Sequence, residues 1–181
     1  MSTSQESKSK QTLIFTYGTL KRGFANHYLM QDLMNENAAV FLGPYITYQP
    51  YPLVCGPYNI PYLIHLSGSG NRVKGELYSV SMEGLARLDE LEGTKIGHYD
   101  RLPVEIQSEE GEGLVKAEAY FANKSYGERL WVKKGKVGMN EYNMTDGKLY
   151  VKPGDRAKGR RIVDDIELFL SSIQRLDQPF G

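Results

Sequence analysis

The hydrophobic pattern begins with a short apolar run that leads into a glycine loop. Thr12 to Tyr17 is rich in β-favouring residues and stops at Gly18, which predicts a buried strand. A loop to Gly23 follows, and Asn26 is placed to cap a helix whose apolar residues share one face. Residues 1–11 are polar, without the apolar region of a secretory signal, and predict a disordered tail.

The next part of the chain is broken by proline. Between Ala38 and His65, β-favouring pieces alternate with prolines, which avoid central strands, so irregular, edge-like structure is expected. A turn at 67–70 precedes the alternating stretch Arg72 to Val80. The pattern therefore predicts a hairpin from Ile60 to Val80.

Three further elements complete the predicted core. Ser81 can cap a helix that runs through Leu91 and ends at Gly93. Strands are predicted at Leu102–Gln107 and Leu114–Phe121, joined by an acidic turn that contains glycine. An amphipathic helix is predicted at 162–176. Because the strands and helices do not alternate strictly, the pattern favours the α+β class, with one domain at 12–150 and an extension at 151–181.

Composition narrows the class of protein. The chain has 181 residues with 22 acidic and 22 basic side chains, so no overall field attracts nucleic acid or an anionic membrane. No apolar run approaches the roughly 20 residues that span a bilayer. A single cysteine, Cys55, suits a reducing compartment, and we expect a cytoplasmic protein. The balanced charge fits a monomer at least as well as a dimer.

The helix after Ser81 carries the most informative carboxylate. Leu85, Leu88 and Leu91 define its apolar face, and Glu92 projects near the middle of that face. An acid facing apolar surroundings at a helix C-terminus has two reasons for a raised pKa, which suits a general base. The alternative is that the helix ends early and Glu92 pairs with Arg101 or Lys95 at the surface.

The loop from Tyr17 to Gly23 is the second candidate. A strand end, a glycine and a helix start leave backbone N–H groups free for an oxyanion or a carboxylate, although many such loops are only turns. The loop lacks the Lys-Ser/Thr of a Walker A motif, and the chain has neither a G-x-S-x-G elbow nor a zinc signature. Cys55 could be a thiol nucleophile, but a buried structural cysteine is the commoner case.

An ordered set of short motifs runs from Leu13 to Phe121. It includes the Tyr-Gly-Thr-Leu-Lys-Arg-Gly loop at 17–23, Leu-Asp-Glu-Leu-Glu at 88–92, and Tyr99 with Arg101. Together these motifs resemble the gamma-glutamylcyclotransferase superfamily. Further likeness to gamma-glutamylaminecyclotransferase and to plant avirulence-induced-gene-2-like proteins lies in Asn26-His27, residues 51–54, Ile60-Pro61 and residues 75–78. The resemblance implies a small mixed β-barrel with flanking helices.

The same resemblance implies a reaction and a site. The substrate would be a gamma-glutamyl amine or amino acid, with glutathione least favoured, and the product 5-oxoproline. No metal or cofactor is implied. Glu92 would be the catalytic residue, and the implied substrate-binding residues are Tyr17, Gly18, Thr19, Leu20, Tyr99 and Arg101. The alternative is a non-catalytic binding or stress and defence-response protein that keeps the fold.

Overall fold

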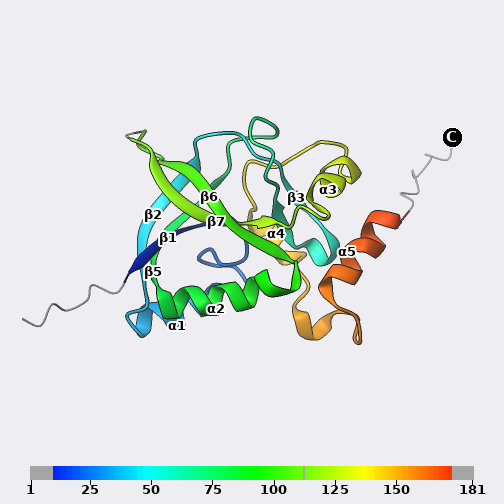
Figure 1. The fold of residues 1–181 in the computed structure, drawn as a ribbon, viewed down its shortest axis with the longest axis horizontal. Helices are drawn as coiled ribbons and strands as arrows, with labels where there is room; N and C mark the ends of the chain where they lie inside the picture. Colours follow the sequence, from blue (N-terminus) through cyan, green and yellow to red (C-terminus); the bar gives the residue numbers. More distant parts are fainter. Residues whose placement is uncertain (1–9, 112, 173–181) are drawn as a thin grey trace, which may run out of the picture.

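Five strands close into a mixed barrel in the computed structural model, which describes residues 10–111 and 113–172 (Figure 1). Around the barrel the order is β1, β5, β2, β6, β7, and a parallel pairing of Ile14 with Glu118 joins β7 back to β1. Two short strands, β4 and β3, continue from β7. The bounds are β1 Gln11–Thr16, β2 Ala39–Thr47, β3 Leu53–Cys55, β4 Pro61–Leu63, β5 Lys74–Ser81, β6 Tyr99–Ser108 and β7 Val115–Ala122.

Helices pack around this barrel, and the α+β prediction is confirmed. In Figure 1, α2 runs below the barrel strands and α5 lies at the opposite side of the molecule from β2. In the described part of the chain, no helix is long and apolar enough to cross a membrane. The helices are α1 His27–Asn35, α2 Met82–Glu92, α3 Gly127–Lys133, α4 Met144–Lys148 and α5 Ile162–Ser171, with 3-10 turns at Pro57–Asn59, Thr94–Ile96 and Pro153–Asp155.

The barrel wall separates two apolar cores. Neighbouring residues of one strand alternate between them: Ile14 packs in one core and Phe15 in the other, and Tyr120 and Phe121 divide in the same way. This is the period of two expected of a barrel strand. The core that holds Ile14 and Tyr120 also holds Leu88 of α2, so this helix is fixed against the outer face on which the candidate site lies.

The predicted hairpin from Ile60 to Val80 is wrong. β4 pairs with β3 and with β7, whereas β5 pairs with β1 and β2. The expectation of irregular structure from Ala38 to His65 also missed the nine-residue strand β2. Pro44 is tolerated there because the pairing of β2 with β6 starts only at Tyr45, so Pro44 has a partner strand on the β5 side alone.

The remaining elements agree closely with the sequence pattern. Ser81 caps α2 by accepting a hydrogen bond from the backbone N–H of Gly84, and the β6–β7 hairpin forms as expected. Gln11 belongs to β1 and not to a tail, while residues 1–9 lie outside the described part. The final helix, expected to reach Leu176, is described as far as Ser171, and Ile166 is its buried anchor.

Candidate active site

The loop after β1 is tied to the start of α1. The backbone N–H of Asn26 donates to the Thr19 carbonyl at 2.9 Å, and its side-chain amide donates to the Thr19 hydroxyl at 2.9 Å. Nδ1 of His27 lies 2.9 Å from the Leu20 carbonyl oxygen. Asn26 occupies the expected N-cap position but makes no capping bond, because its side chain holds the loop instead. These contacts fix the backbone of the loop.

Three consecutive N–H groups of this loop are left free. The backbone N–H groups of Gly18, Thr19 and Leu20 donate to no acceptor in the described part of the chain. All three residues line a small cavity of about 30 Å³. Because buried N–H groups are almost always paired, a row of free ones beside a cavity is the arrangement that binds an oxyanion or a carboxylate.

Gly18 is required by a close approach of two segments. A Cβ at this position would lie 2.6 Å from Cγ of Pro61, the first residue of β4. Pro61 lines the same cavity. Any larger side chain at residue 18 would therefore push the loop away from β4 and displace the free N–H groups.

Glu92 lines the same cavity as this loop. It is the last residue of α2, and Gly93 ends the helix in the left-handed conformation with φ of 66°. The carboxylate has no hydrogen-bond or ion-pair partner among the residues that the structure describes. Burial raises the pKa of Glu92 to about 8. Its carboxyl group can therefore lose and regain a proton near neutral pH, which a general base requires.

Arg101 does not line the cavity, contrary to the role that the resemblance implied. Its guanidinium pairs with Asp89 at 2.5 Å and with Glu118 at 2.6 Å. Asp89 in turn accepts a hydrogen bond of 2.7 Å from the Tyr120 hydroxyl, and Tyr120 lines the cavity. Arg101 thus acts on the cavity through Asp89 and Tyr120. The surface pairing of Glu92 with Arg101, the alternative left open by the sequence, is not formed.

Tyrosine rings form much of the cavity wall. The Tyr17 hydroxyl donates to the Tyr120 carbonyl at 2.5 Å and accepts from the Leu63 N–H at 3.3 Å. The Tyr99 hydroxyl donates to the Pro61 carbonyl at 2.7 Å. Burial raises the pKa of Tyr17 and Tyr99 well above the usual value, so both stay neutral. Their hydroxyls are engaged by the backbone, and they offer ring surface to the cavity.

The structure brings together six of the seven residues indicated by the sequence. Glu92, the loop residues 17–20 and Tyr99 line one cavity, and Arg101 stands behind it. Sequence reasoning missed Tyr120 and Pro61. The register of the predicted β6–β7 hairpin, which pairs Arg101 with Tyr120, could have indicated Tyr120. Pro61 belongs to the Ile60-Pro61 motif of the resemblance, but its place in the cavity wall depends on β4 joining β7, which no local pattern predicts.

A larger cavity of about 400 Å³ adjoins the first and shares Thr19, Glu92 and Tyr99 with it. One wall comes from the wall segment, defined here as residues 150–162, through Tyr150, Lys152, Pro153, Arg156 and Ile162. His98 also lines this cavity, and burial, with a smaller effect of Arg156, lowers its pKa to about 3. His98 is therefore neutral and cannot supply an acidic proton at neutral pH.

Other reactive groups lie apart from these cavities. Cys55 is buried and lines neither of them, and burial raises the pKa of its thiol to about 12. In the described ranges, no three His, Cys, Asp or Glu side chains are grouped so that they could hold a metal ion. Glu92 is the titratable carboxyl common to both cavities.

A closed mixed barrel with a recessed cavity, in which an unpaired carboxyl faces free N–H groups, defines an enzyme for small molecules. Residues 14–159 match the family model "Gamma-glutamyl cyclotransferase, AIG2-like", and the chain belongs to this family. A protein of Arabidopsis thaliana that carries gamma-glutamylcyclotransferase as a provisional name is 48% identical over 173 residues, which are 89% of this chain and 92% of that protein.

Animal relatives agree with this assignment. Human gamma-glutamylaminecyclotransferase is 45% identical over 96 residues, which cover 52% of this chain and 61% of the human protein. The crystal structure of an AIG2-like protein from Mus musculus superimposes with a TM-score of 0.65 at 31% identity, covering 83% of this chain and 99% of the mouse one. The barrel predicted from the resemblance is thereby confirmed.

Proposed function

We propose that this protein converts a gamma-glutamyl amine or a gamma-glutamyl amino acid into 5-oxoproline and the free amine. The observation that carries the proposal is Glu92, an unpaired carboxyl with a pKa of about 8, set in one cavity with the free N–H groups of residues 18–20. Membership of the cyclotransferase family and the names of its relatives support the same reaction.

The reaction needs a base and an acid but no nucleophile from the protein. The alpha-amine of the substrate attacks its own gamma-carbonyl, so the attack is intramolecular. Glu92, as the carboxylate, takes a proton from the amine as the C–N bond of the ring forms. The same proton then passes to the departing nitrogen as the original amide bond breaks, which leaves Glu92 ionised again.

The loop and the tyrosines would hold the substrate during these steps. The N–H groups of Gly18, Thr19 and Leu20 are suited to bind the alpha-carboxylate or the oxygen that gains charge at the gamma-carbon, and one such donor can lower the barrier by about 3 kcal/mol. Tyr17 and Tyr99 enclose the glutamyl chain with their rings. Cytoplasmic location remains part of this proposal and rests on the single cysteine.

The test is release of 5-oxoproline from gamma-glutamyl-lysine, gamma-glutamyl-alanine and glutathione. Glu92→Gln keeps the shape of the side chain but cannot accept a proton, so we expect kcat to fall at least about a thousandfold. Glu83→Gln, in the first turn of the same helix and away from both cavities, is the control and should keep wild-type activity. A wild-type protein inert toward all three substrates refutes the proposal and favours the non-catalytic alternative.

A further inference from the structure

The two cavities divide the space beside Glu92 by size. The smaller cavity is lined by the loop that carries the free N–H groups. The larger cavity extends from Thr19, Glu92 and Tyr99 to the wall segment. If the glutamyl part of a substrate lies against the loop, the scissile bond lies beside Glu92. The leaving amine then has only the larger cavity of about 400 Å³ to occupy. The residues of that cavity would determine which amine is accepted.

Cationic side chains prevail on the walls of the larger cavity. Lys152 is exposed there, and its ammonium group has no hydrogen-bond or ion-pair partner in the described part of the chain. Arg156 is anchored, because its Nε donates to the Val151 carbonyl at 2.9 Å and its Nη2 donates to the Tyr150 hydroxyl at 3.0 Å. Its Nη1 has no acceptor among the described residues, so a directional donor pair remains available.

The opposing charges at this cavity are few. Glu90 is the exposed acid on its wall, and Glu92, with a pKa of about 8, is mostly protonated at neutral pH. His98 is held neutral by burial. Two fixed positive charges thus stand against one negative charge, and an anionic group on the leaving amine would be attracted.

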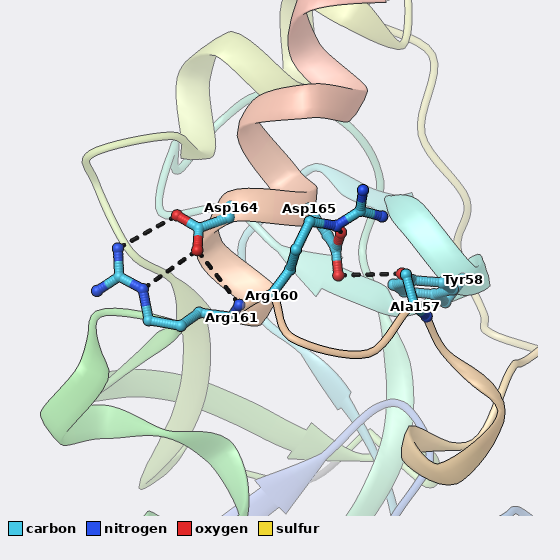
Figure 2. Close-up of polar contacts among 6 residues, drawn as sticks. All are labelled: Tyr58, Ala157, Arg160, Arg161, Asp164 and Asp165. Carbon is cyan, nitrogen blue, oxygen red and sulfur yellow. Dashed lines mark hydrogen bonds and ion pairs between the residues drawn. The ribbon is translucent and has the colours of Figure 1, made fainter.

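The wall segment is held in place by a buried carboxylate of α5. Asp165 is 6% exposed, accepts a hydrogen bond of 3.0 Å from the Tyr58 hydroxyl, and pairs with Nε of Arg160 at 2.8 Å (Figure 2). The Tyr58 carbonyl accepts the backbone N–H of Val151 at 3.0 Å, and the Arg156 guanidinium lies 5.2 Å from the Tyr58 ring. Tyr58 therefore joins α5 to the part of the wall that carries Arg156.

We propose that the wall segment forms the binding site for the leaving amine, and that Lys152 and Arg156 select gamma-glutamyl compounds whose amine carries a carboxylate. This inference rests on the proposed function, since it names the substrate class of the same site. A salt bridge to the carboxylate would be available in the ground state and in the transition state, so the selection appears in kcat/KM.

Two matched pairs of substrates isolate the carboxylate. Gamma-glutamyl-alanine and gamma-glutamyl-alaninamide differ in one charge, and ε-linked gamma-glutamyl-lysine differs from gamma-glutamyl-cadaverine by the carboxylate alone. We expect kcat/KM to be at least about tenfold higher for the carboxylated member in at least one pair. A hydrogen bond to a charged group stabilises a complex by enough to give a factor of this size. Equal values within both pairs, or a preference for the uncharged or cationic member through Glu90, overturn the inference.

Variants then assign the preference to residues. Lys152→Met and Arg156→Gln should each reduce the ratio within the preferred pair, and the double variant should bring it close to one. Lys148→Met, an exposed lysine outside both the wall segment and the cavity lining, is the control and should keep the ratio. The ratio of the two kcat/KM values does not change when part of the protein is unfolded, because the measured rates for both substrates then fall by the same factor. A ratio unchanged in the double variant refutes the assignment, whereas absence of all turnover in wild type refutes the proposed function instead.

Discussion

The half-buried carboxyl of Glu92 should make the protein less stable as the pH rises. Its pKa is about 8 in the folded chain and near 4.5 in the unfolded one, because burial penalises the charged form. Between these values the folded state binds more protons than the unfolded state. Stability therefore falls as pH increases from about 4.5 to about 8, and the loss is complete above that range. Glu92→Gln removes this dependence because the amide does not titrate.

The size of the effect follows from the two pKa values. Each unit of difference corresponds to about 1.4 kcal/mol. Between pH 5 and pH 9 the penalty for ionising Glu92 grows by about 4 kcal/mol, which is an upper limit because the cavity opens to solvent and water screens the charge. Glu92→Gln should gain stability over wild type by up to this amount across the range. If Glu92 is the base, as proposed, its position costs the protein stability at high pH.

The assay is denaturant unfolding of wild type and Glu92→Gln at pH 5 and pH 9. The difference between the two proteins is taken at each pH, so that groups common to both cancel. Glu90→Gln, an exposed neighbour on the same helix, is the matched control and should stay within about 0.5 kcal/mol of wild type at both values. If the difference for Glu92→Gln is the same at pH 5 and pH 9, the carboxyl is not buried as described and the reasoning fails.

Three other perturbations test separate parts of the structure. Gly18→Ala places a Cβ 2.6 Å from Pro61 and should lower kcat/KM about tenfold or more, while unfolding measurements show a folded protein. Asp165→Ala should cost about 1–3 kcal/mol in thermal or denaturant unfolding, whereas Glu167→Ala on the same helix, which removes an exposed ion pair with Arg129, should cost less than about 1 kcal/mol; equal losses would contradict the anchoring role. Cys55, with a pKa of about 12, should resist alkylation in the native protein, and rapid inactivation by iodoacetamide would support a thiol enzyme instead.

The parts of the site that the sequence could predict are those set by local periodicity. Helix α2 is fixed by its cap, its three leucines and Gly93, so the direction of Glu92 follows from its position along the helix. The hairpin of β6 and β7 is likewise set by its turn. The glycine loop could be found because a strand end and a helix start leave N–H groups unpaired.

The parts that could not be predicted depend on distant pairings. β4 lies beside β7 through the parallel pairing of Leu63 with Phe121, and no local pattern near Pro61 in the sequence indicates this partner. The resemblance predicts that Arg101 binds the substrate carboxylate, because its charge suits that group. In the structure its guanidinium instead forms ion pairs with Asp89 and Glu118. The wall segment is tied to the site through Tyr58, whose carbonyl accepts the Val151 N–H, and through Tyr150, whose hydroxyl accepts from the Asn26 side chain. No periodic pattern in the sequence connects these residues.

The closure of the barrel has a consequence for the order in which the chain acquires its activity. β1 and its loop are made early, but the hydroxyl of Tyr17 is held by the carbonyl of Tyr120, 103 residues later in the sequence. Contacts of such long range are slow to form, since the chain between them must first be brought together. During synthesis, the cavity around Glu92 therefore stays incomplete until β7 and then the wall segment have emerged, and a nascent chain gains its active site last.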